Sequence, residues 1–163
     1  MTTIAIIVAV AKDNVVGAGN NIPWYCPADL QYFKRITLGS PVLMGRKTYQ
    51  SLKIKPLPGR RNIIVTRDQE LMCEGCDVVM SLEAGLQLAS DEEKLFIIGG
   101  ADIYQQAMSL AEELYITYVD VKVEGDRFFP DIEMSEWELV REQPYIADDK
   151  NHHMVFKFFT RRA

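Results

Sequence analysis

Asp29 is the residue whose type and position point most directly to chemistry. It follows Pro27 by two positions, and the fixed φ of proline suits the first position of a helix, so Asp29 falls in the first helical turn. Phe33 lies one turn later on the same face, and Leu30 flanks it. A carboxylate on such an apolar face should meet a cation or a hydrogen-bond donor, because burying an unpaired charge is costly.

Two opposing effects act on the pKa of this carboxyl group. The start of a helix favours the anion, whereas burial favours the neutral acid. The sequence leaves open which effect prevails. It also leaves open a plainer interpretation, in which Asp29 is exposed and only stabilises the helix dipole.

Glycines, hydroxyls and basic side chains follow three predicted strands, at residues 44–48 (MGRKT), 65–67 (VTR) and 98–101 (IGGA). Ligands of open parallel sheets bind beyond the carboxyl ends of the strands. Each motif alone is a weak signal, and Gly-Gly before a helix is more often a tight turn. Together they predict a long ligand with several phosphates, such as a dinucleotide. Because the chain has no G-x-G-x-x-G motif, this is not the usual Rossmann site.

The elements that must position these residues alternate between strand and helix. Apolar, β-branched runs predict strands at 4–10, 41–44, 62–66, 77–80, 95–98, 114–121, 137–142 and 153–160. Helices are expected from Pro27, from Arg46, after a Ser81 cap with Ala84 and Leu88 inward, and over 101–111. This order predicts a single α/β domain over 1–163. Its mostly parallel sheet has about eight strands, antiparallel at the C-terminal end, and about four flanking helices.

Composition limits the possible partners and the compartment. A net charge of −5 argues against a nucleic-acid or anionic-membrane binder. Three cysteines and no export signal favour a reducing, cytoplasmic setting, and the apolar run 4–10 is too short to span a bilayer. No metal is expected. The Cys73–Cys76 pair lacks two zinc ligands, and the adjacent His152 and His153 face opposite ways on a strand.

Five motifs in order make the chain resemble the dihydrofolate reductases of the bacterial chromosomal type over essentially its whole length. They lie at residues 21–34, 44–48, 56–62, 97–104 and 124–130. The resemblance implies reduction of 7,8-dihydrofolate to tetrahydrofolate for one-carbon metabolism, with hydride transfer from NADPH to C6 and protonation at N5. It also implies a monomer that binds antifolate inhibitors.

The resemblance assigns roles residue by residue. Asp29 would bind the 2-amino group and N3 of the pterin and assist protonation, supported by Thr117, with Trp24 holding a water and Tyr104 in the pocket. The implied substrate-binding residues are Ile7, Ala9, Asp29, Leu30, Phe33, Leu52, Leu57, Arg60, Ile98 and Thr117, with Arg60 taking the glutamate α-carboxylate. The implied cofactor-binding residues are Ala9, Val16, Ile22, Gly45, Arg46, Lys47, Thr48, Thr66, Arg67, Ile98, Gly99, Gly100, Ala101, Asp102, Ile103 and Tyr104.

Residues 14–24 would form a lid over the nicotinamide, and the resemblance implies a cis peptide at Gly99–Gly100. Asp102 departs from the family pattern, because some bacterial relatives carry a basic residue there, so Arg67 would bear more of the phosphate recognition. The loop at 53–55 is also one residue longer than the shortest in the family. Two alternatives are a same-fold reductase of a pyrimidine or ribosyl intermediate and a non-catalytic nucleotide-binding protein.

Overall fold

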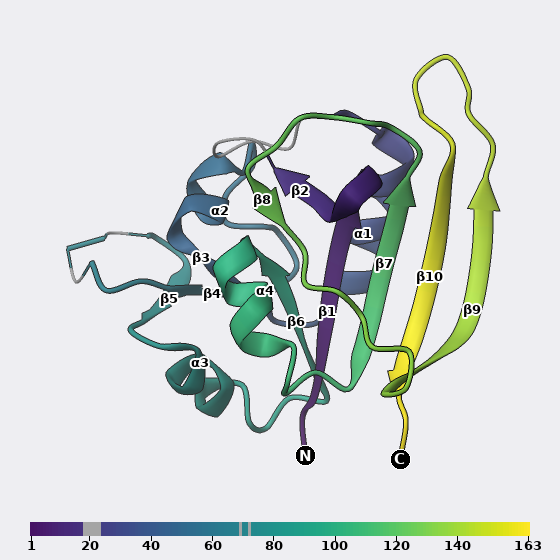
Figure 1. Cartoon of the computed structure of the whole chain (residues 1–163). Helices are drawn as coiled ribbons and strands as arrows, with labels where there is room; N and C mark the ends of the chain where they lie inside the picture. The colour runs from purple at the N-terminus through teal and green to yellow at the C-terminus, as the bar shows by residue number, and fades with distance from the viewer. Residues whose placement is uncertain (18–23, 69, 72) are drawn as a thin grey trace.

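An eight-stranded sheet in the order β5-β4-β3-β6-β1-β7-β10-β9 forms the centre of this computed structural model, which describes residues 1–17, 24–68, 70, 71 and 73–163 (Figure 1). The first six strands in that order run parallel, whereas β10 is antiparallel to β7 and β9. The strands are β1 (Thr3–Val10), β3 (Val42–Gly45), β4 (Asn62–Val65), β5 (Cys76–Val79), β6 (Lys94–Gly99), β7 (Glu113–Val119), β9 (Trp137–Tyr145) and β10 (Met154–Arg161). The predicted mixed sheet with antiparallel C-terminal strands is confirmed.

The continuous apolar runs become strands covered on both faces. Along β1, Ile6 and Val8 point into one core, and Ala5 and Ile7 point into the other, because successive side chains of a strand face opposite ways. Helices α3 (Leu82–Leu88) and α4 (Ala101–Ala107) pack on the first face. Helices α1 (Pro27–Thr37) and α2 (Arg46–Ser51) pack on the second. Figure 1 shows α4 in front of the sheet and α1 behind it.

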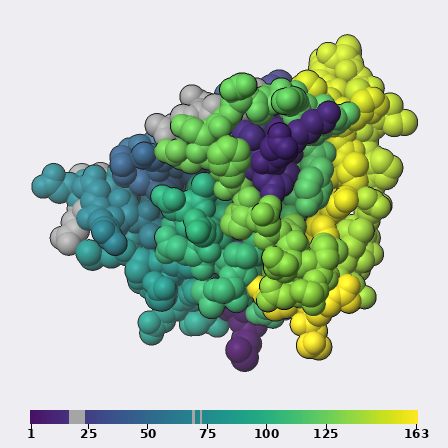
Figure 2. Space-filling model, in the orientation of Figure 1, coloured from purple at the N-terminus to yellow at the C-terminus, as the bar shows by residue number. Residues whose placement is uncertain are grey.

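A small second sheet lies beside the start of the predicted lid. Strand β2 (Val15–Gly17), which follows the 3-10 turn η1 (Lys12–Asn14), pairs with β8 (Arg127–Phe128). The Nδ2 amide of Asn14 donates to Asp131 Oδ1 at 3.0 Å. The segment between β7 and β9 thereby covers part of the near face, as Figure 2 shows. The predicted lid over residues 14–24 thus contains a strand, β2, that is too short to carry an alternating pattern.

Two local predictions about the helices were wrong. Helix α4 ends at Ala107 rather than at Ala111, because the chain turns there to enter β7 at Glu113. Ala84 is exposed and does not face inward. The Ser81 cap is confirmed, since its side chain accepts a hydrogen bond from Ala84 N at 3.0 Å.

Gly85 and Leu82 are the buried residues of α3. A Cβ atom at Gly85 would lie 2.5 Å from Leu43 Cδ1, so a side chain there would displace the fully buried Leu43. We expect Gly85→Val to lower the free energy of unfolding by about 1–3 kcal/mol through overpacking. Urea denaturation measures this loss. Ala84→Val, on the exposed side of the same helix, is the control, and equal losses for the two variants would contradict the packing explanation.

The helices of the described residues are short, and α1, with 11 residues, is the longest of them. None of them has the length and apolar character needed to cross a membrane.

Candidate active site

The three glycine-rich and basic motifs come together at one edge of the sheet. Strands β4, β3 and β6 are neighbours, with Gly45 opposite Val65 and Met44 opposite Gly99. A Cβ atom at Gly45 would lie 3.9 Å from the backbone nitrogen of Gly100, so the two glycine turns are almost in contact. The prediction that separate strand ends build one site is therefore supported by the register of the sheet.

A cleft of ≈ 660 Å³ opens at this edge, a volume typical of small-molecule sites. Fifteen of the sixteen implied cofactor residues line it: Ala9, Val16, Gly45, Arg46, Lys47, Thr48, Thr66, Arg67, Ile98, Gly99, Gly100, Ala101, Asp102, Ile103 and Tyr104. The remaining one, Ile22, lies outside the described residues. Cationic and hydroxyl side chains beside glycine backbone are the donors that phosphate groups need, so this cleft fits a dinucleotide.

The cleft also has lining residues that the sequence interpretation missed. Met80 and Ser81 follow β5 just as Thr66 and Arg67 follow β4. Because ligands of parallel sheets bind beyond the carboxyl ends of the strands, these two residues could have been predicted. Arg127 also lines the cleft. It belongs to β8 and is far along the sequence from the other basic residues of the cleft. No local pattern signals its position, because the pairing of β8 with β2 is a long-range contact.

Asp29 meets its hydrogen-bond donor on β7. The hydroxyl group of Thr117 donates to the Asp29 carboxylate, and Thr117 is itself 1% exposed. Burial raises the pKa of Asp29, and the Thr117 hydrogen bond opposes this rise. Burial therefore prevails at this helix terminus. The interpretation of Asp29 as an exposed, idle residue is wrong, because the side chain is largely removed from solvent.

Apolar side chains of the implied substrate site gather from several elements into one cluster. Ile7 and Ile98 are buried in the same cluster as three half-buried residues of the implied substrate slot, which are Phe33, Leu52 and Leu57. Leu30 lies at the rim, with 53% of its surface exposed. Ala9 and Trp24 pack against a neighbouring cluster beneath the start of α1.

Tyr104 connects the carboxyl pocket to the cofactor cleft. Its hydroxyl group donates to the carbonyl oxygen of Ile7 at 2.9 Å, and its side chain also lines the cleft. Its pKa is raised, first by burial and then by the negative charge of Asp29. The effect of Asp29 on this pKa places the two residues close together, so the pocket and the cleft are adjacent.

Arg60 is held at the outer end of the slot. Its Nη1 atom donates to Thr37 Oγ1 at 3.0 Å and its Nε atom donates to the Pro58 carbonyl oxygen at 3.0 Å. Thr37 in turn donates to the Phe33 carbonyl oxygen at 2.8 Å. Burial lowers the pKa of the Arg60 guanidinium group. These contacts fix the plane of the guanidinium group, which is the geometry that bidentate carboxylate recognition requires.

A family model described as dihydrofolate reductase matches residues 3–162 of the chain. The chain therefore belongs to the dihydrofolate reductase family. Similar family members include the dihydrofolate reductase of Neisseria gonorrhoeae, 52% identical over 84% of this chain and 85% of its own length. Dihydrofolate reductase type 3 of Salmonella typhimurium is 45% identical over 92% of each chain. The dihydrofolate reductase of Bacillus subtilis is 42% identical over 91% of this chain and 88% of its own.

A solved structure supports the same assignment. The dihydrofolate reductase from Enterococcus faecalis, complexed with NADP(H) and RAB-propyl, superposes with a TM-score of 0.92. The two chains are 32% identical, and the match covers 99% of this chain and 97% of the other. The cis peptide that the family resemblance implied at Gly99–Gly100 is present, and Lys55–Pro56 is also cis. Among the described residues, no group of three or more His, Cys, Asp or Glu side chains could hold a metal ion.

Proposed function

We propose that this dihydrofolate reductase family member reduces 7,8-dihydrofolate to 5,6,7,8-tetrahydrofolate with NADPH and so supports one-carbon metabolism. The observation that carries the proposal is Asp29, a largely buried carboxyl group of raised pKa that lies near Tyr104 of a cleft that fits a dinucleotide. Among the groups that shift the pKa of Asp29, the Thr117 hydroxyl group is the hydrogen-bond donor, and the pterin would supply further donors through its N–H groups. Family membership and the NADP(H)-bound structural relative support the same reaction.

NADPH supplies the hydride when it is bound. The chain positions it: Gly45 and Gly100 let the backbone approach the ligand, and Arg46, Lys47 and Thr48 provide charge and a hydroxyl for its phosphates. Thr66 and Arg67 serve the 2′-phosphate at the other end of the cleft. Asp102 adds a negative charge to the same cleft, which places more of the phosphate recognition on Arg67.

The proposed substrate-binding site has a polar end, which binds the pterin, and an apolar slot. Asp29 binds the 2-amino group and N3 of the pterin, and its raised pKa favours the protonated form from which N5 receives its proton by way of water held near Trp24. Thr117 acts as a positioning residue for Asp29. The residues Ile7, Ala9, Leu30, Phe33, Leu52, Leu57 and Ile98 form the walls, and Arg60 binds the glutamate α-carboxylate.

The 2′-phosphate assignment makes a direct prediction. Removing the Arg67 guanidinium group in Arg67→Ala should weaken NADPH binding by about 10- to 100-fold and leave NADH binding nearly unchanged, since only NADPH carries that phosphate. Fluorescence titration of both nucleotides measures this. Arg61→Ala is the matched control, because Arg61 pairs with Asp77 outside the cleft at 2.7 Å. Equal weakening of NADPH and NADH would remove Arg67 from the phosphate site.

A reductase of the same fold that acts on a pyrimidine or ribosyl intermediate is the rival interpretation. Such an enzyme has no use for a pterin-binding acid and a carboxylate-binding Arg60 at the two ends of one slot. The test is the loss of NADPH absorbance on adding dihydrofolate, compared with NADPH alone. A rapid loss of absorbance supports the proposal. No loss of absorbance with a folded protein that binds NADPH would contradict it.

We further propose a single domain over residues 1–163, a monomer in solution and a cytoplasmic setting, with antifolates as inhibitors and neither nucleic acid nor membrane as a partner. Residues 14–24 are proposed as the lid that excludes water from the nicotinamide, and residues 18–23 of this segment lie outside the described residues. The β2–β8 pairing supports this role, because it anchors the beginning of the segment next to Arg127 in the cleft.

A further inference from the structure

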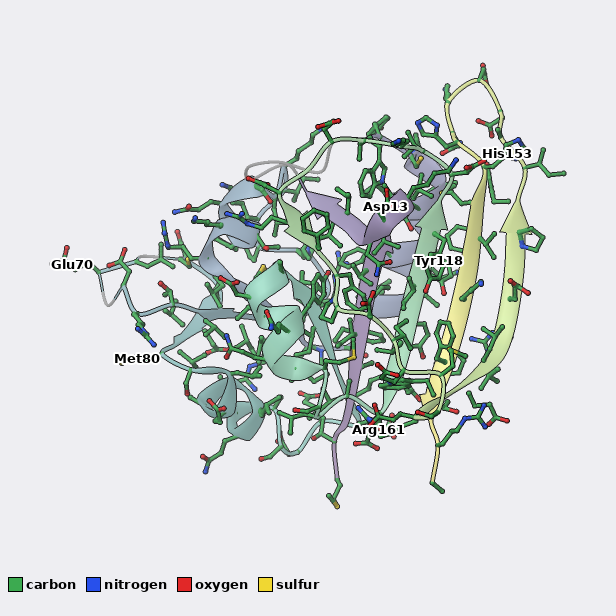
Figure 3. The ribbon with its side chains drawn as sticks, viewed as in Figure 1. Asp13, Glu70, Met80, Tyr118, His153 and Arg161 are labelled. Atoms are coloured by element: carbon green, nitrogen blue, oxygen red, sulfur yellow. The ribbon has the colours of Figure 1, made fainter. Side chains whose placement is uncertain are left out.

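A pair of thiols that the proposed reaction does not use lies at one edge of the sheet. Cys73 lies in the loop before β5 and Cys76 is the first residue of β5, with Glu74 and Gly75 between them, and both cysteines are free and half-buried. Glu70, labelled in Figure 3, marks the outer part of this loop, which extends away from the body of the molecule. Small solutes can therefore approach the loop from solvent.

The backbone already holds the two cysteines at a suitable separation for a covalent bond. Cys76 N donates to the Cys73 carbonyl oxygen at 3.3 Å, which closes a four-residue turn, and Gly75 has the positive φ of +80° that the third position of a type II turn needs. A β-turn brings its end Cα atoms within about 7 Å, and disulfides span about 4.4–6.8 Å between Cα atoms. Closure therefore needs little movement of the backbone.

The two thiols also interact. The thiol of Cys76 donates to the carbonyl oxygen of Glu74 at 3.8 Å, and the Cys73 thiol and the hydroxyl group of Tyr49, which lies in α2, are near enough to shift its pKa. Burial raises the pKa of the Cys76 thiol, while the Tyr49 hydrogen bond favours the thiolate that attacks in disulfide chemistry. Cys26, in contrast, is 3% exposed and packs with Val119 and Met154 in a separate cluster.

We propose that Cys73 and Cys76 form an oxidation site that a peroxide converts into an intramolecular disulfide. One thiol loses its proton, and the thiolate attacks an oxygen atom of hydrogen peroxide, whose O–O bond breaks. This gives a sulfenic acid, and the hydroxide that leaves takes up the proton to become water. The second thiol then attacks this sulfur, forms the S–S bond and releases a second water. The two sulfurs together lose two electrons and the peroxide gains them. A dithiol reductant reverses the reaction.

The disulfide also acts on the cofactor cleft, an extension that rests on the proposed function. To bond, the sulfurs must approach to about 2.05 Å, so Cys76 gives up its contact with the Tyr49 hydroxyl group. Tyr49 follows Thr48, which lines the cofactor cleft, and packs in the same cluster as Leu52 and Leu57. Oxidation therefore loosens α2 at the end where the NADPH phosphates are proposed to bind.

The covalent half of the proposal is tested by titrating the full-length protein with hydrogen peroxide. The expected result is a fall in free thiols from three to one, a mass loss of two hydrogens and a Cys73–Cys76 peptide on mapping. Cys26→Ser, the matched control, should form the same disulfide, and Cys73→Ser should not. Retention of all three thiols, prior oxidation of Cys26, or disulfides between chains would overturn the proposal.

The effect of the disulfide on the cofactor cleft is tested by measuring NADPH binding rather than turnover. The disulfide form should bind NADPH about two- to tenfold more weakly, as expected for the loss of one hydrogen bond, and dithiol reduction should restore the affinity. Cys73→Ser treated with peroxide should keep its affinity. A disulfide form with unchanged affinity would overturn the link to α2. Failure of the reduced protein to bind NADPH at all would instead count against the proposed function.

Discussion

Asp29→Asn is expected to lower turnover of dihydrofolate at neutral pH by at least about 100-fold, because the substitution removes the acid that assists protonation of N5. The amide keeps the size of the side chain and can still accept the hydrogen bond from Thr117. Steady-state kinetics with saturating NADPH measures the loss. Asp91→Asn, which removes an exposed carboxylate between α3 and β6, is the control for the change of net charge.

The same substitution should not harm the fold. Because the pKa of Asp29 is raised in the folded chain, the folded state binds this proton more tightly than the unfolded state does. Ionising Asp29 therefore costs stability, and that cost appears as pH rises from the unfolded pKa through the raised folded pKa and persists above it. The neutral amide of the Asp29→Asn variant avoids this cost, so the variant should show a higher urea midpoint at neutral pH. Lost turnover together with a lowered midpoint would mean misfolding rather than chemistry.

The pH profile of the wild-type enzyme provides an independent test of the same group. The rate of the chemical step should fall as pH rises through the raised pKa of Asp29, since the proton donor is then lost. Thr117→Val removes the hydrogen bond that lowers this pKa, so the profile should shift to higher pH. A structural effect of Thr117 alone would change the amplitude of the profile and leave its position unmoved.

The sequence predicted the architecture well because the central strands, such as β1 and β6, are buried on both faces. Runs such as Ile4–Val10 have few alternatives to a central parallel strand, and glycines at strand ends placed the cleft. Asp29 was identified as unusual because it is a charged residue on the apolar face of a helix. The need for a hydrogen-bond donor followed from physical chemistry, but its identity as Thr117 came from the family resemblance, since the two residues are far apart in the chain.

The parts that the sequence did not reveal depend on long-range contacts or on very short elements. Strand β2 has three residues and pairs with β8, which has two. Neither strand is long enough to show an alternating apolar pattern in the sequence. Arg127 enters the cleft only through that pairing. Ala84 was predicted to face the sheet, but the neighbouring Gly85 is the buried residue, and a side chain there would displace Leu43. Apolar periodicity cannot signal a contact that depends on the absence of a side chain.

Arg60→Leu should raise KM for dihydrofolate by about 10- to 100-fold with little change in kcat. The guanidinium group is proposed to bind the glutamate α-carboxylate, far from the reacting atoms, so its loss weakens ground and transition states alike. Leucine removes the positive charge that lies over the Phe33 ring, whose centre is 5.9 Å from the Arg60 Cζ atom, but keeps an apolar side chain at this position. Steady-state kinetics at saturating NADPH separates the two parameters.

The positioning contact of Arg60 supplies a graded control for this prediction. Thr37→Val keeps the volume of a fully buried side chain but removes the hydroxyl group that accepts the Arg60 Nη1 hydrogen bond at 3.0 Å. The guanidinium group is then present but less firmly oriented, so KM should rise by a smaller factor than in Arg60→Leu. A pteridine lacking the glutamate tail should be reduced equally well by all three proteins, because none of these contacts reaches the pterin end. If Arg60→Leu instead lowered kcat with KM unchanged, Arg60 would act on the chemical step, and the proposed orientation of the substrate in the slot would be wrong.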